Sequence, residues 1–470
     1  MTETERIWAN IALSRTENLG QSSFLKAEYD AWRTSKKLAE MAEGSRYYAG
    51  DSDITRRVRQ VIGENGIKTV IDNVPNNRCK SNFTKLLADQ KTAYLLSKTP
   101  SIKSDDASVS ELLEGYFDAK MWNLLRNAGT EAIIKGIAWL NVYYSDDGKL
   151  CLKLIPSEQV IPFWADDAHT ELDGVLRVYE TDVYENGAKQ VLVRAEFYTH
   201  EGVRRFIQVG GEFLPDIEAG FESGHFRKGD TEMTWDIIPF IPIKYNQNEK
   251  TLTSSIKSLN DAYDKILSDM INAIEEDPRS SILVLRNYDG QDLGEFRRNL
   301  CTYGAVKVCD DGGVETLSVK VDPAVYETAE KMLRAAIIKN GRGVDTMGQT
   351  VGNAPSGIAM RFIYSDLELD CNNFANEISA SLDKLIWFIF SDIAIRTGKS
   401  LFGSRVEFIF NCDMLVNEKD IIDACKQSAG MISEKTIIAN HPWVTDAEKE
   451  MTAKKSEISA GKDDESDGMA

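Results

Sequence analysis

Two long stretches of the chain predict helices, the first from apolar residues that recur at steps of three and four and the second from a long run without helix-breaking residues. One stretch runs from Ser254 to Glu276. The other runs from Ser356 to Ile395, about forty residues with no proline and no internal glycine beyond Gly357. At ~1.5 Å per residue the second helix would be a rod of roughly 60 Å, far longer than the usual three or four turns. The stripe of the first helix consists of Ile256, Leu259, Tyr263, Ile266, Leu267, Met270, Ile271 and Ile274.

Shorter segments also carry helical spacing or helix-forming composition. Pro323 stands where proline is favoured, at the start of a helix, and Pro100 ends another. The final segment, Lys454 to Ala470, has almost no apolar content, so we expect it to be disordered. The further predicted helices are the polar region up to Gly44, a surface helix over Asp53 to Ile71, Asn82 to Ser97, Ala324 to Lys339, and Asn417 to Trp443.

Between Ala138 and Tyr245 the pattern changes to that of strands joined by tight turns. Asp146-Asp147-Gly148, Asn186-Gly187 and Gly210-Gly211 are hairpin signals, because such turns need positive φ. This region predicts an antiparallel sheet with helices on its flank. Smaller strands are expected at Ser281–Leu285, Ala305–Val308, Val314–Val319 and Arg405–Phe410, with a turn at Asp310–Gly313.

The elements predict an α+β fold of several domains, since 470 residues exceed a single core. Two helices bracket the small β module of residues 281–319, and we expect them to lie side by side with the module at their far ends. The net charge is −19, whereas a protein that grips DNA tightly presents a basic face. The seven cysteines form no CxxC pair, which favours reduced thiols.

The sequence predicts neither a secretory signal nor a membrane span. The N-terminus is charged from Glu3 to Arg6. The best apolar run, Leu385 to Phe390, stops at Ser391 and is far short of the ~20 residues that a span needs.

We find no constellation typical of an enzyme, a metal site or a cofactor site. The four histidines are isolated. Thr397-Gly398-Lys399-Ser400 imitates the end of a phosphate-binding loop, but Ile393 stands where that motif needs glycine. We interpret it as a helix end closed by Gly398. The glycine-containing stretch from Gly341 to Pro355 has no lysine for a phosphate and is expected to be a flexible connector.

The stripe of the first long helix has two interpretations. It could be an ordinary core face, or it could pack between copies of the chain. The bracketed β module favours the second interpretation, because a module held out on two rods has little of its own protein to pack against. The residues predicted to form a subunit interface are Leu259, Tyr263, Leu267, Met270 and Ile274.

The order of these parts resembles the portal proteins of tailed bacteriophages, in the branch with long non-contractile tails. Each piece is a weak motif alone, but five in the right order are specific. The pieces are Tyr47 to Ile54; Pro75 to Arg78 with Asn82, Lys85, Asp89, Lys91, Tyr94, Leu95 and Pro100; Asn246 with Leu259 to Asp264, Ser268-Asp269 and Asn272 to Glu275; Pro355 to Phe362; and Gly430 to Thr436.

The resemblance implies a portal-type fold with a β-rich wing, a two-helix stem, a small α/β clip, a long helix after a tunnel loop, and a helical crown. The implied boundaries are 1–250 for the N-terminal helices and wing, 251–279 and 322–342 for the stem helices, 280–321 for the clip, 343–355 for the tunnel loop, 356–415 for the long helix and a return strand, 416–453 for the crown, and 454–470 for the acidic tail.

The resemblance further implies a structural protein of the virion, assembled in the host cytoplasm, without catalysis, membrane or cofactor. About twelve copies would form a ring at one capsid vertex, with a channel for packaging and ejecting double-stranded DNA. The implied partners are the large terminase subunit, the head–tail connector, and the major capsid and scaffolding proteins. Tunnel-loop residues touching DNA transiently would be Asp345, Met347, Gln349, Thr350, Val351 and Asn353.

Charge agrees with such a conduit. Twelve chains would carry a formal charge of about −228 (12 × −19), and few phosphate contacts keep affinity for DNA low. Two alternatives stay open at this stage. One is another phage structural protein, such as a connector or tail component. The other is a nucleotide-dependent motor, which the missing phosphate-binding loop disfavours.

Overall fold

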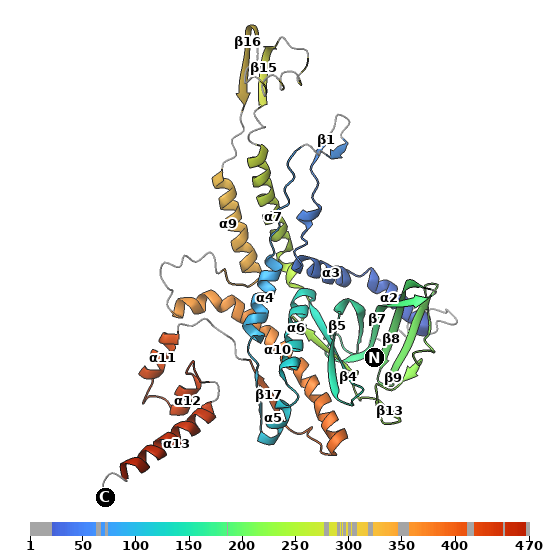
Figure 1. The fold of residues 1–470 in the computed structure, drawn as a ribbon, viewed down its shortest axis with the longest axis vertical. Coiled ribbons are helices and arrows are strands. Elements are labelled where there is room, and N and C mark those ends of the chain that lie inside the picture. Colours follow the sequence, from blue (N-terminus) through green and yellow to red (C-terminus); the bar gives the residue numbers. More distant parts are fainter. Residues whose placement is uncertain are drawn as a thin grey trace. The chain divides into compact units, whose positions relative to one another are not determined.

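The computed structural model describes residues 21–62, 67–70, 74–185, 187–276, 282–288, 308–317, 323–345, 357–410, 418–444 and 447–466, with single residues at 292, 294, 298 and 302. Figure 1 shows the elements in sequence colours. The chain divides into two compact units. The first comprises residues 1–89 and 130–341, and the second comprises residues 90–129 and 342–470. Within the described part of the chain, no helix is apolar enough over a sufficient length to cross a bilayer.

The first unit begins with helices α2 (Gln21–Arg33) and α3 (Lys36–Tyr48). The predicted helix over Asp53 to Ile71 was wrong. The structure has a short 3₁₀ turn, η1 (Asp53–Arg56), and a hairpin of β1 (Gln60–Ile62) and β2 (Lys68–Val70). The β-branched residues of this stretch, which we counted as a helical face, favour strands instead.

The predicted β region is confirmed, but it forms separate sheets rather than one. A six-stranded antiparallel sheet has the order β10-β9-β8-β7-β6, with β11 added beside β9. Turns at Gly187 (φ 78°) and at Gly210 and Gly211 (φ 60° and 86°) join its hairpins, as predicted. The strands are β6 (Val160–Trp164), β7 (Leu172–Glu185), β8 (Ala188–Thr199), β9 (Gly202–Val209), β10 (Glu212–Pro215) and β11 (Glu222–Ser223).

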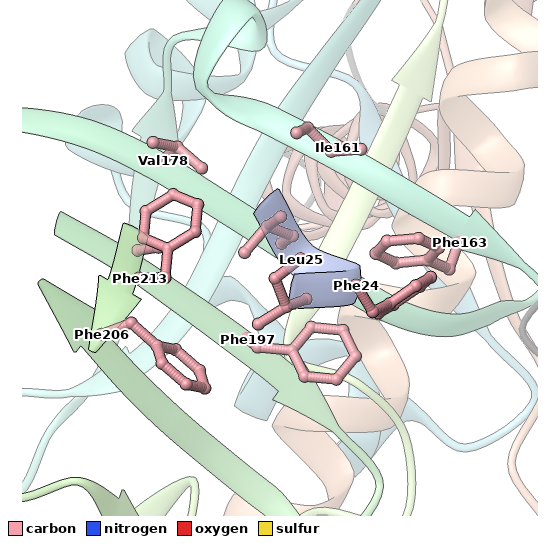
Figure 2. Close-up of a cluster of buried hydrophobic side chains, with 10 residues drawn as sticks. Phe24, Leu25, Ile161, Phe163, Val178, Phe197, Phe206 and Phe213 are labelled. Carbon is pink, nitrogen blue, oxygen red and sulfur yellow. The ribbon is translucent and has the colours of Figure 1, made fainter. Parts of the chain in front are cut away.

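One core lies between this sheet and α2. Figure 2 shows Phe24 and Leu25 of α2 among side chains from β6 to β10. The ring centroids of Phe24 and Phe163 lie 5.6 Å apart, and Phe163 meets Phe197 edge-on. The polar helix at the N-terminus therefore contributes buried aromatic and aliphatic anchors to the sheet.

A second, three-stranded sheet has the order β14-β4-β5 and consists of β14 (Phe240–Lys244), β4 (Ile137–Tyr144) and β5 (Leu150–Ile155). The 3₁₀ turn η2 (Ser157–Gln159) separates β5 from β6, and this turn divides the two sheets. Trp139 and Trp164 pack together in the core here, with ring centroids 5.8 Å apart. A small hairpin, β12 (Phe226–Lys228) and β13 (Thr231–Met233), completes the region.

Two helices bracket a β hairpin, as predicted. They are α7 (Leu252–Glu276) and α9 (Pro323–Asn340), which lie side by side in Figure 1. Between them β15 (Ile282–Tyr288) pairs with β16 (Val308–Leu317). The predicted turn at Asp310–Gly313 was wrong, because this stretch lies within β16. The ladder shifts there, with Arg286 opposite Gly313 but Tyr288 opposite Val308, so the glycine-rich residues bulge from a strand instead of ending one.

Helix α10 (Gly357–Thr397) of the second unit confirms the predicted rod, with 41 residues. Gly398 follows it at φ +71°, and its N–H donates to the carbonyl of Ala394 at 2.9 Å. The motif Thr397–Ser400 is thus a helix end. The unit also contains β3 (Ser101–Ser104) paired with β17 (Val406–Ile409), and helix α5 (Ala107–Glu114). Helices α4 (Phe83–Leu96) and α6 (Ala119–Lys135) each continue from one unit into the other.

The C-terminal region differs from the prediction in two places. Where we expected one helical segment from Asn417 to Trp443, the structure has α11 (Glu418–Gln427) and α12 (Glu434–Ala439), and Ser433 caps α12. Where we expected disorder after Lys454, helix α13 extends over Ala447–Ser466. This segment is rich in alanine, glutamate and lysine, which are good helix formers. Its low apolar content means that the helix has no face to bury, but it does not prevent a helix from forming.

Candidate functional site

The predicted interface stripe on α7 changes its environment along the helix. Tyr263 is buried in its own chain, where its hydroxyl donates to Glu330 Oε1 of α9 at 2.8 Å and its ring meets Phe83 edge-on. Leu259, Leu267 and Met270 are half-buried. Ile274 is 60% exposed. The stripe therefore begins as a core face and ends as an uncovered one.

Four large apolar side chains lie exposed on the two helices that bracket the β hairpin. Ile271 and Ile274 belong to α7, and Val325 and Met332 belong to α9, with exposed fractions from 40% to 68%. Single exposed hydrophobic residues are common on proteins. A concentration on one pair of helices is instead typical of a surface that another chain covers.

Another face of α7 is buried and polar, and our sequence reasoning missed it. Asn260, Asp264, Ser268 and Asn272 repeat every four residues and are all buried. Three of them accept hydrogen bonds from main-chain N–H groups of the segment before α4. Ser81 donates to Asp264 Oδ1 at 2.8 Å, Cys79 donates to Ser268 Oγ at 2.9 Å, and Asn77 donates to Asn272 Oδ1 at 2.7 Å.

We call these three contacts the α7 ladder, and simple geometry explains them. Four residues of an α-helix advance ~6 Å along its axis. Two residues of extended chain advance ~6.6 Å, and alternate amides point to the same side. Each polar side chain of α7 therefore meets the next alternate amide. The four-residue repeat of small polar residues was the signal that could have revealed this face.

Asp264 is the most enclosed member of the α7 ladder, with no exposed surface. Burial raises the pKa of its carboxyl, while hydrogen bonds from Ser52 and Ser81 act in the opposite direction. Its second oxygen accepts from Ser52 Oγ at 2.6 Å and from Asn260 Nδ2 at 3.1 Å. The carboxyl thus joins η1, α7 and the segment before α4.

The six predicted loop residues mostly lie outside the described part of the chain. Asp345 is described and half-buried. Met347, Gln349, Thr350, Val351 and Asn353 belong to residues 346–356, which the structure does not describe. The roles assigned to all six stay predictions. The residues just before them contact Gln90 and Lys91 of α4 and Asp370 of α10.

A hollow of about 490 Å³ lies between α3, the β6–β7 connection and the β14–α7 connection. Its charged groups pair with one another. Glu249 binds Lys37, its Oε1 accepts from His169 Nδ1 at 2.7 Å, and Lys250 reaches Glu40 at 3.2 Å. Among the described residues, no three His, Cys, Asp or Glu side chains are grouped so that they could hold a metal ion.

Comparison with known proteins points to one family. A family model described as phage portal protein, SPP1 Gp6-like, matches residues 32–464. The chain is 28% identical over 438 residues to the portal protein of Bacillus phage SPP1, covering 90% of this chain and 86% of that relative. It is 26% identical over 430 residues to the portal protein of Clostridium phage phiCD119, covering 87% and 90% respectively.

A solved structure is also similar, at greater distance. It is a chain from the neck of a native GTA particle computed with C12 symmetry. The TM-score is 0.38 with 14% identity, and the alignment covers 76% of this chain and 88% of that one.

Proposed function

The chain belongs to the SPP1 Gp6-like family of phage portal proteins, and from that premise we propose that α7 and α9 are the stem of a ring whose bore conducts DNA. As a portal protein it is a structural component of the virion and forms the channel for DNA passage at the capsid vertex. The ring has about twelve copies. The number and the part-by-part roles below are our proposal.

The exposed apolar residues on the stem helices carry this proposal. A closed ring requires heterologous contacts, in which one face of a subunit meets a different face of the next. Ile271, Ile274, Val325 and Met332 give each chain uncovered apolar surface on both stem helices. Burying such surface contributes about 25 cal/mol per Å², and a ring repeats the contact at every subunit.

The remaining parts follow from their order along the chain. The wing is the β-rich region up to residue 250. The clip is residues 280–321, with the β15–β16 hairpin, and it docks the large terminase subunit and later the head–tail connector. The tunnel loop is residues 343–355, the crown is residues 416–453, and the major capsid and scaffolding proteins contact the outside of the ring.

The DNA contact is transient and independent of base sequence. A net charge of −19 per chain provides few favourable phosphate contacts, and counterion release therefore adds little to affinity. A low affinity suits a channel, since tight binding would slow the passage of the genome.

Electron microscopy of the purified full-length protein tests the proposal. We expect closed rings of about twelve subunits with a bore wide enough for a duplex. Solid particles or monomers at micromolar concentration would overturn it. A ring of another size with a much wider bore would favour a connector or tail component, and steady ATP hydrolysis by the pure protein would favour a motor.

A further inference from the structure

The chain that leaves α9 is held tightly by two helices of the second unit. Gln90 of α4 makes two hydrogen bonds with the main chain of Val344: its Nε2 donates to the carbonyl at 3.0 Å, and its Oε1 accepts from the N–H at 2.9 Å. A side-chain amide thus pairs with the residue as a neighbouring strand would. Both polar groups of one peptide residue are satisfied by a single side chain.

Lys91 makes the adjoining contact. Its side chain is 1% exposed, and its Nζ donates to the carbonyl of Arg342 at 3.1 Å and to Asp370 Oδ2 of α10 at 2.6 Å. Burying a lysine is costly unless the charge is paired and hydrogen-bonded, and here both oxygens serve that purpose. The guanidinium of Arg342 lies 3.5 Å from the other oxygen of Asp370.

The side chain of Val344 completes the attachment. It is buried against apolar residues of the same two helices. Arg342 has φ +49°, a left-handed conformation that is unfavourable for a non-glycine residue and persists only where the surroundings hold it. The buried cluster that contains Val344 also includes Tyr94, Tyr364, Leu367 and Cys371.

We propose that Gln90 and Lys91 of α4, with Asp370 of α10, are positioning residues that fix residues 342–344, the part of the chain that directly precedes residues 345–355. We call this group the loop clamp; it consists of Gln90, Lys91, Arg342, Val344 and Asp370. The inference rests on the proposed function, in which residues 343–355 contact the DNA. A segment that touches a moving duplex needs a fixed origin, and the loop clamp transmits the force on it to α4 and α10.

The sequence had predicted that the chain is flexible, not fixed, directly after Asn340. Glycines at 341 and 343 and no apolar period led us to expect a flexible connector from Gly341 onward. The first residues, Arg342 to Val344, are instead fixed by side chains about 250 positions earlier in the chain, which no local pattern could indicate.

Hydrogen–deuterium exchange on assembled rings tests the loop clamp directly, with Gln90→Ala as the variant. Loss of one such hydrogen bond is expected to speed exchange of the Val344 amide by about tenfold. Amides of β4 and α7 should exchange as before. Gln190→Ala is the matched control, because Gln190 is exposed on β8 of the first unit and the substitution removes the same type of side chain without touching a clamp residue.

Packaging of DNA into heads that carry each ring provides the functional measurement. We expect Gln90→Ala rings to assemble normally and yield fewer full heads, while Gln190→Ala rings match the wild type. Unchanged exchange at Val344 would overturn the clamp. Faster exchange with undiminished packaging would overturn its positioning role, and so would a Gln90→Ala chain that no longer forms rings, since the contact would then serve folding.

The two proposals fail in different ways. If wild-type protein forms no ring or supports no packaging, the proposed function is wrong, and the exchange result still reports on the clamp. If wild-type rings package DNA and Gln90→Ala rings do so equally well, only the positioning role is lost.

Discussion

His225 illustrates how a single residue acquires properties that its sequence neighbourhood does not reveal. In the sequence the four histidines are isolated and carry no signal of a role. In the structure His225 Nε2 donates to the carbonyl of Thr199 at 2.9 Å, and Nδ1 accepts from the N–H of Trp235 at 3.0 Å. This pattern needs the neutral ring. His225 can accept this hydrogen bond because the β12–β13 hairpin brings the N–H of Trp235 close to its ring. No sequence motif indicates this contact.

Lowering the pH is expected to destabilise the first unit through His225. Burial is the largest cause that lowers its pKa, from 6.5 to about 4. Because the folded pKa is depressed, the unfolded chain takes up the proton first as the pH falls below 6.5, and the stabilisation is lost between about pH 6.5 and 4. At pH 5 the loss should be about 2 kcal/mol.

Denaturant unfolding of the full chain at pH 7.5, 6 and 5 measures this loss. The variant His225→Phe should be less stable at pH 7.5, because the Trp235 N–H loses its acceptor, but its stability should depend less on pH. Equal pH slopes for the variant and the wild type would contradict the assignment.

At the scale of elements, local sequence patterns correctly predicted those helices and hairpins whose formation depends on residues close together in the chain. Helix α7 follows from its apolar spacing, helix α10 follows from a long run without proline or internal glycine, and the β7–β8 hairpin follows from its Asn-Gly turn. The hairpin of residues 60–70 was missed because its β-branched residues also fit a helical stripe. The buried face of α7 was missed because polar residues are normally assigned to solvent, and their partners lie about 190 positions away.

The α7 ladder makes a prediction for Ser268. Ser268→Ala removes the acceptor of the Cys79 N–H and leaves that donor buried, so we expect a loss of about 1–3 kcal/mol in the free energy of unfolding. Ser258→Ala is the matched control on the same helix, because Ser258 is exposed; it should change stability by less than about 0.5 kcal/mol. The urea concentrations at the unfolding midpoints of both variants test this prediction. Equal midpoints would show that the Ser268 contact does not contribute to the free energy of unfolding.

At the scale of the whole molecule, the order of the parts predicted the family, while the extent of packing within the single chain could not be predicted. The stripe on α7 was open to two interpretations, and the structure shows that its environment is not uniform: Tyr263 packs internally, whereas Ile274 stays exposed in the single chain. Periodicity reports that a face is apolar, not what covers it. The division of the chain into two units that share α4 and α6 was equally hidden, because it depends on long-range contacts.

Ring assembly is expected to depend on Ile274. Because this side chain is 60% exposed, Ile274→Asp should leave the fold of the single chain intact, yet bury an unpaired charge in a subunit contact. We expect monomers or small oligomers by light scattering, with unchanged circular dichroism. Ser258→Asp adds the same charge at a polar exposed position of α7 and should still form rings. Intact rings from Ile274→Asp would show that this part of α7 is free in the assembly.

In the α7 ladder, four residues of helix and two residues of extended chain cover nearly the same distance. This match limits how the length of either segment can change. One residue inserted between Asn77 and Ser81 would turn the following amides to the opposite side and offset them by ~3.3 Å. All contacts beyond the insertion would then be lost together. The amides and the polar side chains of α7 align again only when two residues are inserted in the segment for every four inserted in α7. Evolution can therefore lengthen this pairing only by such matched insertions.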